Sequence, residues 1–347
     1  MSSSPHGTIG GWSHHHLLGL QGLDAASIRA VLAHASRIPA CGPSGASEAP
    51  RRDDLRGRTV ATLFFEDSTR TRTSFTLAAQ RLGAETVDLS GGVTSVNKGE
   101  TIVDTALTVE AMGVDAMVIR ARQSGAAAMA ARRVSCPVIN AGDGCHEHPT
   151  QGLLDILTIA EAHGRAETFD LSGLTIVVVG DVTSSRVARS GIAGLTALGA
   201  SVVAVGPPGM VVPAHTHLAA PGGPGQVSVR HDLDPVLAQA DAVMMLRIQF
   251  ERHGDAPSAA GARRGAVIPS IREYRHGYAM TAQRADTLRP GAVVLHPGPM
   301  NRGLEIDGEV ADGSRSVVLR QVSNGVRVRM AVLAMCHAAA RSSRPFA

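Results

Sequence analysis

Aromatic residues are scarce in this chain of 347 residues, where they make up only 3% of the sequence. The cores must therefore be built from Ala, Val, Leu, Ile and Met, and a hydrophobic content of 44% is enough for two α/β domains of ordinary size. The net charge is only +3 and no long basic run occurs. This composition argues against a broad nucleic-acid-binding surface, but it is compatible with local pockets of positive charge.

Cysteine and long apolar runs are also lacking. The four cysteines, Cys41, Cys136, Cys145 and Cys336, do not have the spacing of metal ligands and look like reduced thiols rather than a disulfide framework. No apolar run is long enough to span a membrane, and the N-terminus lacks the core of a signal peptide. We therefore expect a cytoplasmic protein with no membrane partner, with residues 1–13 disordered because they contain little apolar material.

The sequence does contain short apolar runs that alternate with helical patterns. Residues 59–65 and 174–179 are almost wholly apolar, and helical periodicity follows in residues 75–82 and 186–198. Such strands belong to parallel sheets that are covered on both faces, whose ligands bind at the carboxyl ends of the strands. We predict an α/β fold of two doubly wound parallel-sheet domains with the active site in the cleft between them. The expected domains comprise residues 14–152 with 322–347, and residues 153–321.

The segment from Ser68 to Thr73, Ser-Thr-Arg-Thr-Arg-Thr, follows the first of these strands and enters a helix. The start of a helix offers unpaired backbone N–H groups and the positive end of the macrodipole, and both favour an anion. Hydroxyl groups and a guanidinium add further donors. Ordinary N-capping of a solvated helix is the alternative. Two arginines at the carboxyl end of a strand favour a phosphate cradle.

Other strand ends also carry polar groups. Arg120 ends one strand, and His148 and Gln151 enter a helix with a spacing that places them on one face. The run His146-Glu147-His148 suggests a zinc site, but neighbouring residues splay apart and the two histidines lack the helical spacing that lets them share one metal. Hydrogen-bonding roles are favoured over metal binding.

The second half of the chain adds three strand ends. Residues 180–186 lack the G-x-G-x-x-G pattern of a dinucleotide site and instead offer Arg186 at a helix start. Arg247 and Gln249 follow another strand, and their spacing of two residues places both side chains on one face of the extended chain. Pro297-Gly298-Pro299 fixes a rigid turn that exposes backbone carbonyls. With no carboxylate pair or Ser-His-Asp set evident, the ligands are expected to be anionic, and catalysis to rest on charge and positioning.

These motifs together resemble the aspartate carbamoyltransferase family, catalytic chains of bacterial type. The resemblance covers roughly residues 15 to 340 in the family's order. The matching segments are residues 65–72, 98–101, 119–120, 148–151, 185–190, 246–249 and 296–299. The Ser-Thr-Arg-Thr element marks the wider carbamoyltransferase family, whereas Arg-Ile-Gln and His-Pro-Gly-Pro indicate the aspartate branch. An ornithine enzyme is expected to carry His-Cys-Leu-Pro near the last motif.

The resemblance implies transfer of the carbamoyl group of carbamoyl phosphate to L-aspartate, an early step of pyrimidine synthesis, with no cofactor and no metal. It places carbamoyl phosphate on Ser68, Thr69, Arg70, Thr71, Arg120, His148, Gln151, Gly298 and Pro299. It places aspartate on Lys98, Arg186, Arg247 and Gln249. The residues that it implies in catalysis are His148, Arg120, Thr71 and Lys98.

The family's loop around Lys98 reaches into the neighbouring subunit's site, so the resemblance also implies a homotrimer with shared active sites. Related trimers work alone, with zinc-bearing regulatory chains or with dihydroorotase subunits, and the sequence does not distinguish between these three assemblies. Thr94, Asp67 and the pair Ala121-Arg122 depart from the family's usual residues. The alternatives are an acid acceptor other than aspartate, an ornithine enzyme, which Arg247 would disfavour, a catalytically weak assembly partner and a dinucleotide oxidoreductase.

Overall fold

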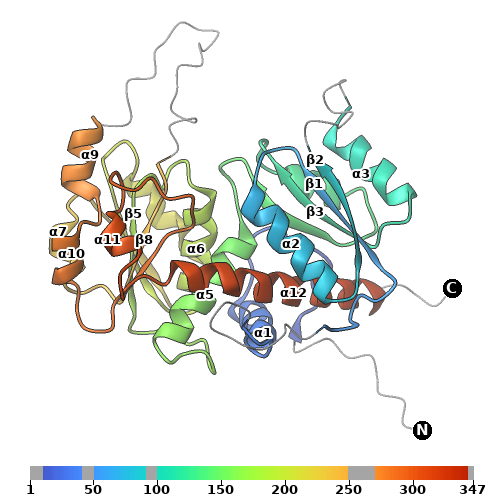
Figure 1. Cartoon of the computed structure of the whole chain (residues 1–347), viewed down its shortest axis with the longest axis horizontal. Coiled ribbons are helices and arrows are strands. Elements are labelled where there is room, and N and C mark those ends of the chain that lie inside the picture. The colour runs from blue at the N-terminus through green and yellow to red at the C-terminus, as the bar shows by residue number, and fades with distance from the viewer. Residues whose placement is uncertain (1–10, 41–50, 91–99, 249–269, 343–347) are drawn as a thin grey trace, which may run out of the picture.

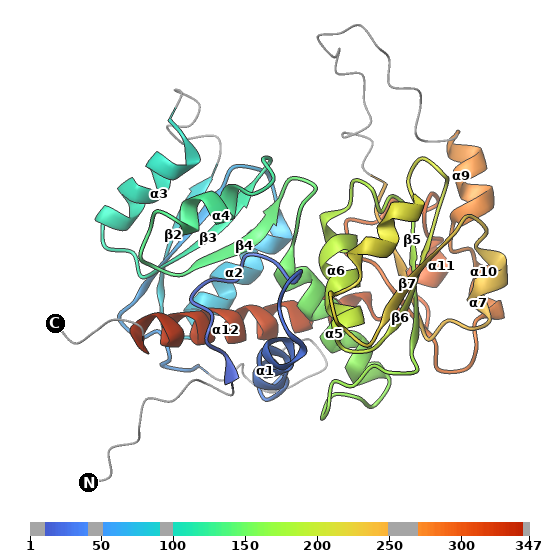
Figure 2. The same ribbon diagram turned by 180° about the vertical axis from the view of Figure 1, so that it is seen from behind.

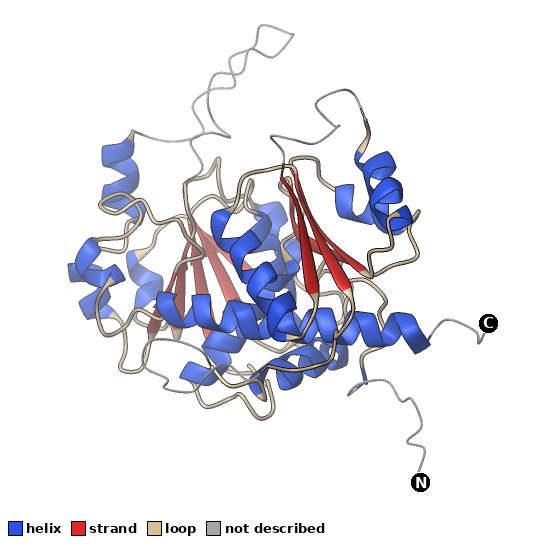
Figure 3. Ribbon diagram, turned by 45° about the vertical axis from the view of Figure 1, so that its right-hand side comes forward, coloured by secondary structure: helices blue, strands red, loops and turns tan. Residues whose placement is uncertain are grey.

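The computed structural model describes residues 11–40, 51–90, 100–248 and 270–342, which form two separate parallel β-sheets with helices on both sides (Figure 3). The strands of the first sheet are β1 (Thr59–Phe64), β2 (Glu85–Ser90), β3 (Ala116–Ala121) and β4 (Val138–Asp143). The strands of the second sheet are β5 (Thr175–Val179), β6 (Ser201–Val205), β7 (Gln226–Arg230), β8 (Ala242–Met245) and β9 (Val293–Leu295).

Helices connect consecutive strands and cover the two faces of each sheet (Figures 1 and 2). Those of the first half are α1 (Ala25–Ser36), α2 (Thr69–Arg81), α3 (Ile102–Ala111), α4 (Ala126–Ala131) and α5 (Pro149–Ala162). Those of the second half are α6 (Arg186–Ala197), the 3₁₀ helix η3 (Pro213–Leu218), α7 (Asp234–Leu237), α9 (Ile271–Tyr278), α10 (Ala282–Thr287), α11 (Gly308–Ala311) and α12 (Val318–Ser342).

The strand order of each sheet reverses direction once. The first sheet has the order β2-β1-β3-β4 and the second β7-β6-β5-β8-β9, and every pairing is parallel. The reversals fall between β1 and β3 and between β5 and β8, which are the places where open sheets of this kind bind ligands.

Alternate residues of the central strands point to opposite layers of helices. In β1, Val60 packs in the apolar cluster that includes α2 and α12, whereas Ala61 packs in the cluster that includes α3 and α4. In β5, Val178 and Val177 divide in the same way between α6 and the helices near α10. Both sheets are therefore covered on both faces, and the prediction of two doubly wound parallel sheets is confirmed.

Two helices join the halves. α5 leaves the first sheet and leads into the second, and the long α12 returns and packs against α1, α2 and α5 (Figure 1). In the ranges that the structure describes, no helix combines the length and apolar character that crossing a membrane requires.

The N-terminal segment is ordered earlier than the sequence predicts. We expected disorder through residue 13, but Trp12 is only 1% exposed and belongs to the main apolar cluster. Leu17 then forms a parallel bridge with Ile139 beside β4. The prediction is wrong for residues 11–13 because a single tryptophan buries enough apolar surface to fix a segment that is otherwise polar. Residues 1–10 lie outside the described ranges.

Candidate active site

One cavity of about 580 Å³ lies where the carboxyl ends of the two sheets approach each other. Its lining includes every predicted site residue that the structure describes: Ser68, Thr69, Arg70, Thr71, Arg120, His148, Gln151, Arg186, Arg247, Gly298 and Pro299. The predicted residues Lys98 and Gln249 lie outside the described ranges. The lining also holds five arginines against two acidic residues, so the cavity is suited to anions.

The first turn of α2 forms one wall of the cavity. Ser68 is the N-cap residue in an extended conformation, but its side chain makes no capping hydrogen bond. Thr69, Arg70 and Thr71 follow as the first three helical residues, whose N–H groups have no intrahelical acceptor. The hydroxyl of Ser68 is thus not used for ordinary capping, and the arrangement favours the phosphate cradle over that alternative.

Arg70 lies against the turn that follows β9. A Cβ atom added to Gly298 would come within 3.0 Å of Arg70 Cζ, and Gly298 has a φ of +65°, so both space and backbone favour glycine there. Partial burial and the nearby Arg247 guanidinium lower the pKa of Arg70. The two cations come from different sheets, and a bound anion would relieve their repulsion.

Glu66, in the loop after β1, connects two further arginines. Its Oε1 accepts from Arg120 Nη2 at 3.2 Å and from Arg186 Nη2 at 3.0 Å, while Oε2 accepts from Arg186 Nη1 at 2.9 Å. Arg120 and Arg186 are 9% and 5% exposed. The carboxylate therefore ties the first sheet to α6 and balances positive charge inside the cavity.

His148 is the N-cap residue of α5 and is buried against the same guanidiniums. Burial, followed by the charges of Arg120, Arg186 and Arg329, holds the pKa of His148 well below its usual value of 6.5. The side chain is therefore a neutral imidazole with one donor and one acceptor nitrogen. Its Nδ1 has no hydrogen-bond partner among the described residues. A neutral donor in a cavity of cations can polarise a carbonyl without giving up a proton.

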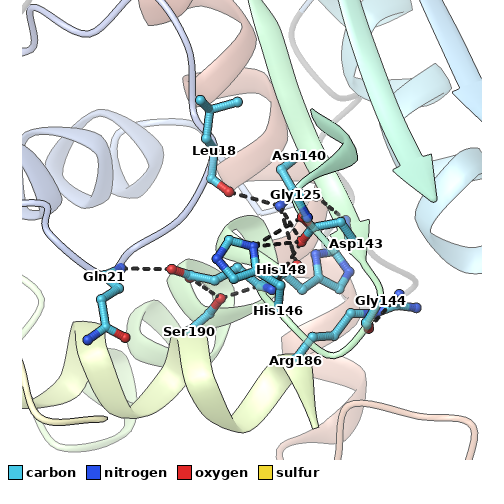
Figure 4. A network of polar contacts seen from close by, with 12 residues as sticks. Leu18, Gln21, Gly125, Asn140, Asp143, Gly144, His146, His148, Arg186 and Ser190 are labelled. Atoms are coloured by element: carbon cyan, nitrogen blue, oxygen red, sulfur yellow. Dashed lines mark hydrogen bonds and ion pairs between the residues drawn. The ribbon is translucent and has the colours of Figure 1, made fainter. Parts of the chain in front are cut away.

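A network of buried polar groups fixes the loop that carries His148 (Figure 4). Ser190 Oγ accepts from His148 N at 2.8 Å and donates to Glu147, whose carboxylate also accepts from the backbone N–H groups of Leu20 and Gln21. Asp143, at the end of β4, accepts from the side chain of Asn140, from Glu147 N and from Gly125 N. The N-terminal segment, β4 and α6 thus converge on His148.

His146, Glu147 and His148 point to different partners. His146 Nδ1 lies 3.1 Å from Asp143 Oδ2 and the ring is half exposed, whereas Glu147 faces the N-terminal segment and His148 faces the cavity. This divergence agrees with the splaying expected of adjacent residues.

The turn after β9 is braced by a buried pair. His296 Nδ1 accepts from Gly298 N at 2.8 Å, so the ring proton lies on Nε2, which is 3.1 Å from Glu305 Oε1. Glu305 Oε1 also accepts from Asn301 N. These contacts hold the Pro297–Pro299 turn against the cavity.

Sequence reasoning missed several residues of the site. Glu66 lies within a matched motif but received no role, and Asp155, Gln321, Arg329 and Glu305 were not singled out. Four of these residues are buried or half-buried with partners far away in the sequence, such as Asp155 and Gln321, which are 166 residues apart. Glu305 is instead buried against His296 and Asn301, which are near it in the sequence. A carboxylate inside an apolar helical run, as in residues 153–160, was the available signal for Asp155.

Two family profiles match this chain. The carbamoyl-phosphate-binding domain of the aspartate/ornithine carbamoyltransferases matches residues 15–161, and the aspartate/ornithine-binding domain matches residues 172–336. Together the matches cover nearly all of the described structure.

Individual relatives agree with the profiles. The aspartate carbamoyltransferase catalytic subunit of Gluconacetobacter diazotrophicus is 49% identical, over 92% of this chain and 91% of its own length. The structure resembles that of Trypanosoma cruzi aspartate transcarbamoylase in complex with carbamoyl phosphate and aspartate, with a TM-score of 0.78, 27% identity and coverage of 95% and 98% of the two chains. It also resembles ornithine carbamoyltransferase from Gloeobacter violaceus, with a TM-score of 0.74, 28% identity and coverage of 94% and 99%.

Proposed function

This chain belongs to the aspartate/ornithine carbamoyltransferase family, and from that premise we propose that it transfers the carbamoyl group of carbamoyl phosphate to the amine of L-aspartate. The products are N-carbamoyl-L-aspartate and phosphate, in an early step of de novo pyrimidine synthesis. The observation that carries the proposal is that Arg70, Arg120, Arg186 and Arg247, from four strand ends of two sheets, line one cavity. Two anionic substrates held side by side need such a concentration of fixed positive charge.

Carbamoyl phosphate binds at the first sheet. Its phosphate lies on the free N–H groups and hydroxyls of Ser68, Thr69 and Thr71, with Arg70 and Arg120 as charged donors. Its carbamoyl amide lies between Gln151 and the carbonyl groups of the turn that contains Gly298 and Pro299. The position of all these groups around one cavity supports this assignment.

Aspartate binds on the side of the second sheet, with its α-carboxylate on Arg186 and its β-carboxylate on Arg247, assisted by Lys98 and Gln249. Its neutral amine attacks the carbamoyl carbon, forming the C–N bond, and the C–O bond to phosphate then breaks. Thr71, Arg120 and the neutral His148 donate to the oxyanion of the tetrahedral intermediate. The departing phosphate takes the amine proton, so no protein base is required. Holding both reactants in place can supply about 7–11 kcal/mol of the barrier reduction.

The residues fall into a carbamoyl-phosphate-binding domain, 14–152 with 322–347, and an aspartate-binding domain, 153–321. The return of α12 to pack against α1 and α2 supports assigning the C-terminal residues to the first domain.

An acceptor panel tests the reaction. Purified protein is incubated with carbamoyl phosphate and with aspartate, glutamate, ornithine or other amines, and phosphate release is followed. We expect turnover with aspartate. Turnover with ornithine alone would overturn the acceptor assignment, and release of phosphate that no amine accelerates would overturn the transfer.

The functional unit is a cytoplasmic homotrimer in which Lys98 of one subunit completes the site of the next. Mixed trimers of Lys98→Ala and Arg70→Ala proteins should regain part of the activity, because each mixed trimer contains one site in which an intact Arg70 meets an intact Lys98 of the next subunit. No recovery after verified subunit exchange would contradict sharing of the site.

Lys98 is the only lysine of the chain, which permits a second test. An amine-selective reagent should inactivate the wild type, substrates should protect it, and a Lys98→Arg variant should resist the reagent. Inactivation of that variant at the wild-type rate would place the sensitive amine elsewhere.

A further inference from the structure

Two glutamine side chains meet on one carboxylate oxygen beneath the cavity. Asp155 lies one turn after Gln151 on α5 and is 0% exposed. Its Oδ1 accepts from Gln151 Nε2 at 2.9 Å and from Gln321 Nε2, on α12, at 2.7 Å. The two helices that join the sheets are therefore linked at this atom.

The carboxylate dictates how both amides are turned. A carboxylate oxygen accepts hydrogen bonds, so each glutamine must present its NH₂ group to Asp155 and its carbonyl oxygen elsewhere. Gln321 follows this rule, because its Oε1 accepts from His296 N at 3.0 Å at the start of the turn after β9. For Gln151, which lines the cavity, the same rule turns Oε1 away from Asp155 and makes it the acceptor that this side chain can offer to a ligand.

We propose that Asp155 is a positioning residue that sets the selectivity for the acyl donor by holding Gln151 with its carbonyl oxygen toward the cavity. The site then recognises an acyl phosphate whose carbonyl carbon carries an N–H donor, and it disfavours one that carries a methyl group. This inference rests on the proposed function. A site built to accept a hydrogen bond discriminates strongly against an analogue that lacks the donor, because its polar group is then left unpaired.

The arrangement does not depend on the charge of Asp155. Burial raises the pKa of this carboxyl from 3.8 to about 7, against the opposing effects of the two glutamines and of Arg329. A protonated carboxyl can carry its hydrogen on Oδ2, which has no partner among the described residues, and Oδ1 then remains an acceptor. An asparagine at this position can keep the same acceptor.

Acetyl phosphate is the matched probe, since it replaces the carbamoyl NH₂ with CH₃. Turnover of carbamoyl phosphate with aspartate is first measured for the wild type, and its absence would refute the proposed function. The dissociation constants of both acyl phosphates are then measured calorimetrically for the wild type, Asp155→Ala and Asp155→Asn. We expect Asp155→Ala to raise the dissociation constant of carbamoyl phosphate about 10-fold and to change that of acetyl phosphate less than about 2-fold. Asp155→Asn should retain most of the selectivity between the two.

A purely structural role predicts a different pattern. Equal weakening of both acyl phosphates by Asp155→Ala would overturn the proposal, and so would a selectivity that disappears in Asp155→Asn. In a double-mutant cycle, Asp155→Ala should cause no further loss of selectivity in a Gln151→Ala background, and additive losses would show that Asp155 does not act through Gln151. If Asp155→Ala does not fold, Asp155→Leu, which has a similar shape without polar atoms, carries the same expectation.

Discussion

Replacing Glu66 with Gln removes one negative charge from between two guanidinium groups while preserving the shape of the side chain. The carboxylate accepts a hydrogen bond from Arg120 Nη2 and one from each Nη atom of Arg186. An amide has only one acceptor oxygen and would turn its NH₂ group toward a cation. The variant therefore loses hydrogen bonds and leaves two buried positive charges without their shared counterion.

The size of the effect follows from the positions of the arginines. A Cβ atom added to Gly142 would lie 3.0 Å from Arg186 Nε and 3.3 Å from Arg120 Nη1, so the two groups flank the same point. The repulsion between the two arginines is present in both proteins, and Glu66→Gln removes the attraction of each guanidinium to the carboxylate. At about 4 Å and an effective dielectric constant of about 20, that attraction is about 4 kcal/mol before the cost of desolvating the carboxylate is subtracted. Because Glu66 is 23% exposed in its side chain, solvent screens part of this, and we expect a loss of about 2 kcal/mol of folding stability.

Thermal unfolding with and without inorganic phosphate measures this loss. Glu66→Gln should lower Tm by about 3 °C without added phosphate, since the unfolding entropy of a chain of 347 residues is large. Phosphate should raise Tm more in the variant than in the wild type, because the bound anion supplies the missing negative charge.

Glu110→Gln is the matched control, since Glu110 also accepts three hydrogen bonds, from Ser135 N, Ser135 Oγ and Cys136 N, and does not line the cavity. Its stabilisation by phosphate should equal that of the wild type. If phosphate stabilises Glu66→Gln no more than the wild type, Glu66 does not balance the arginine pair and the electrostatic reasoning fails.

Other changes address the remaining groups. His148→Ala should lower kcat by about 10²–10³ with a smaller effect on KM for carbamoyl phosphate, and an unchanged kcat would remove His148 from catalysis. Because the pKa of His148 lies well below 6.5, the wild-type pH–rate profile should show no limb between pH 6 and 8 that His148→Ala abolishes. Arg247→Gln should raise KM for aspartate by about 10–100-fold and leave KM for carbamoyl phosphate within about 3-fold. The reverse pattern would place carbamoyl phosphate, and not aspartate, at Arg247. Burial raises the pKa of Asp155 to about 7, so the native state holds its proton more tightly than the unfolded chain, and this stabilisation is lost as pH rises from about 4 to 7. Urea unfolding at pH 5, 6 and 7 should therefore show the wild type losing stability relative to Asp155→Asn by up to about 1.4 kcal/mol per pH unit, and a constant difference would contradict the raised pKa.

The sequence alone predicts the buried strands because a strand covered on both faces is apolar at nearly every position. The same criterion does not find β7, Gln226–Arg230, whose residues are exposed or half-buried and which pairs with β6 at the end of the strand order of the second sheet. Apolar periodicity likewise does not show the first turns of α12. These turns expose Leu319 and Val322 and bury Gln321, which reverses the usual pattern of an amphipathic helix.

Charged groups at strand ends were visible in the sequence because each follows an apolar run directly, as Arg120 and Arg247 do. The residues that orient them were not, because their roles exist only between distant parts of the chain. Glu66 and Arg186 are 120 residues apart, and the link from Asp155 to Gln321 depends on how α12 returns across the molecule. A short motif indicates what a side chain can bind, whereas the contacts that orient that side chain depend on the tertiary fold.

The return of α12 also determines when, during translation, the first half of the chain can complete its fold. This helix emerges from the ribosome after all the other described elements, yet its residues Val328, Val332 and Cys336 complete the apolar cluster shared with α1 and α2. About 200 codons separate the end of β4 from the end of α12, which at 5–20 residues per second is a delay of roughly 10–40 s. The first sheet is therefore covered completely only after α12 has been translated, and a nonsense mutation within the codons of α12 would leave that sheet without this helix.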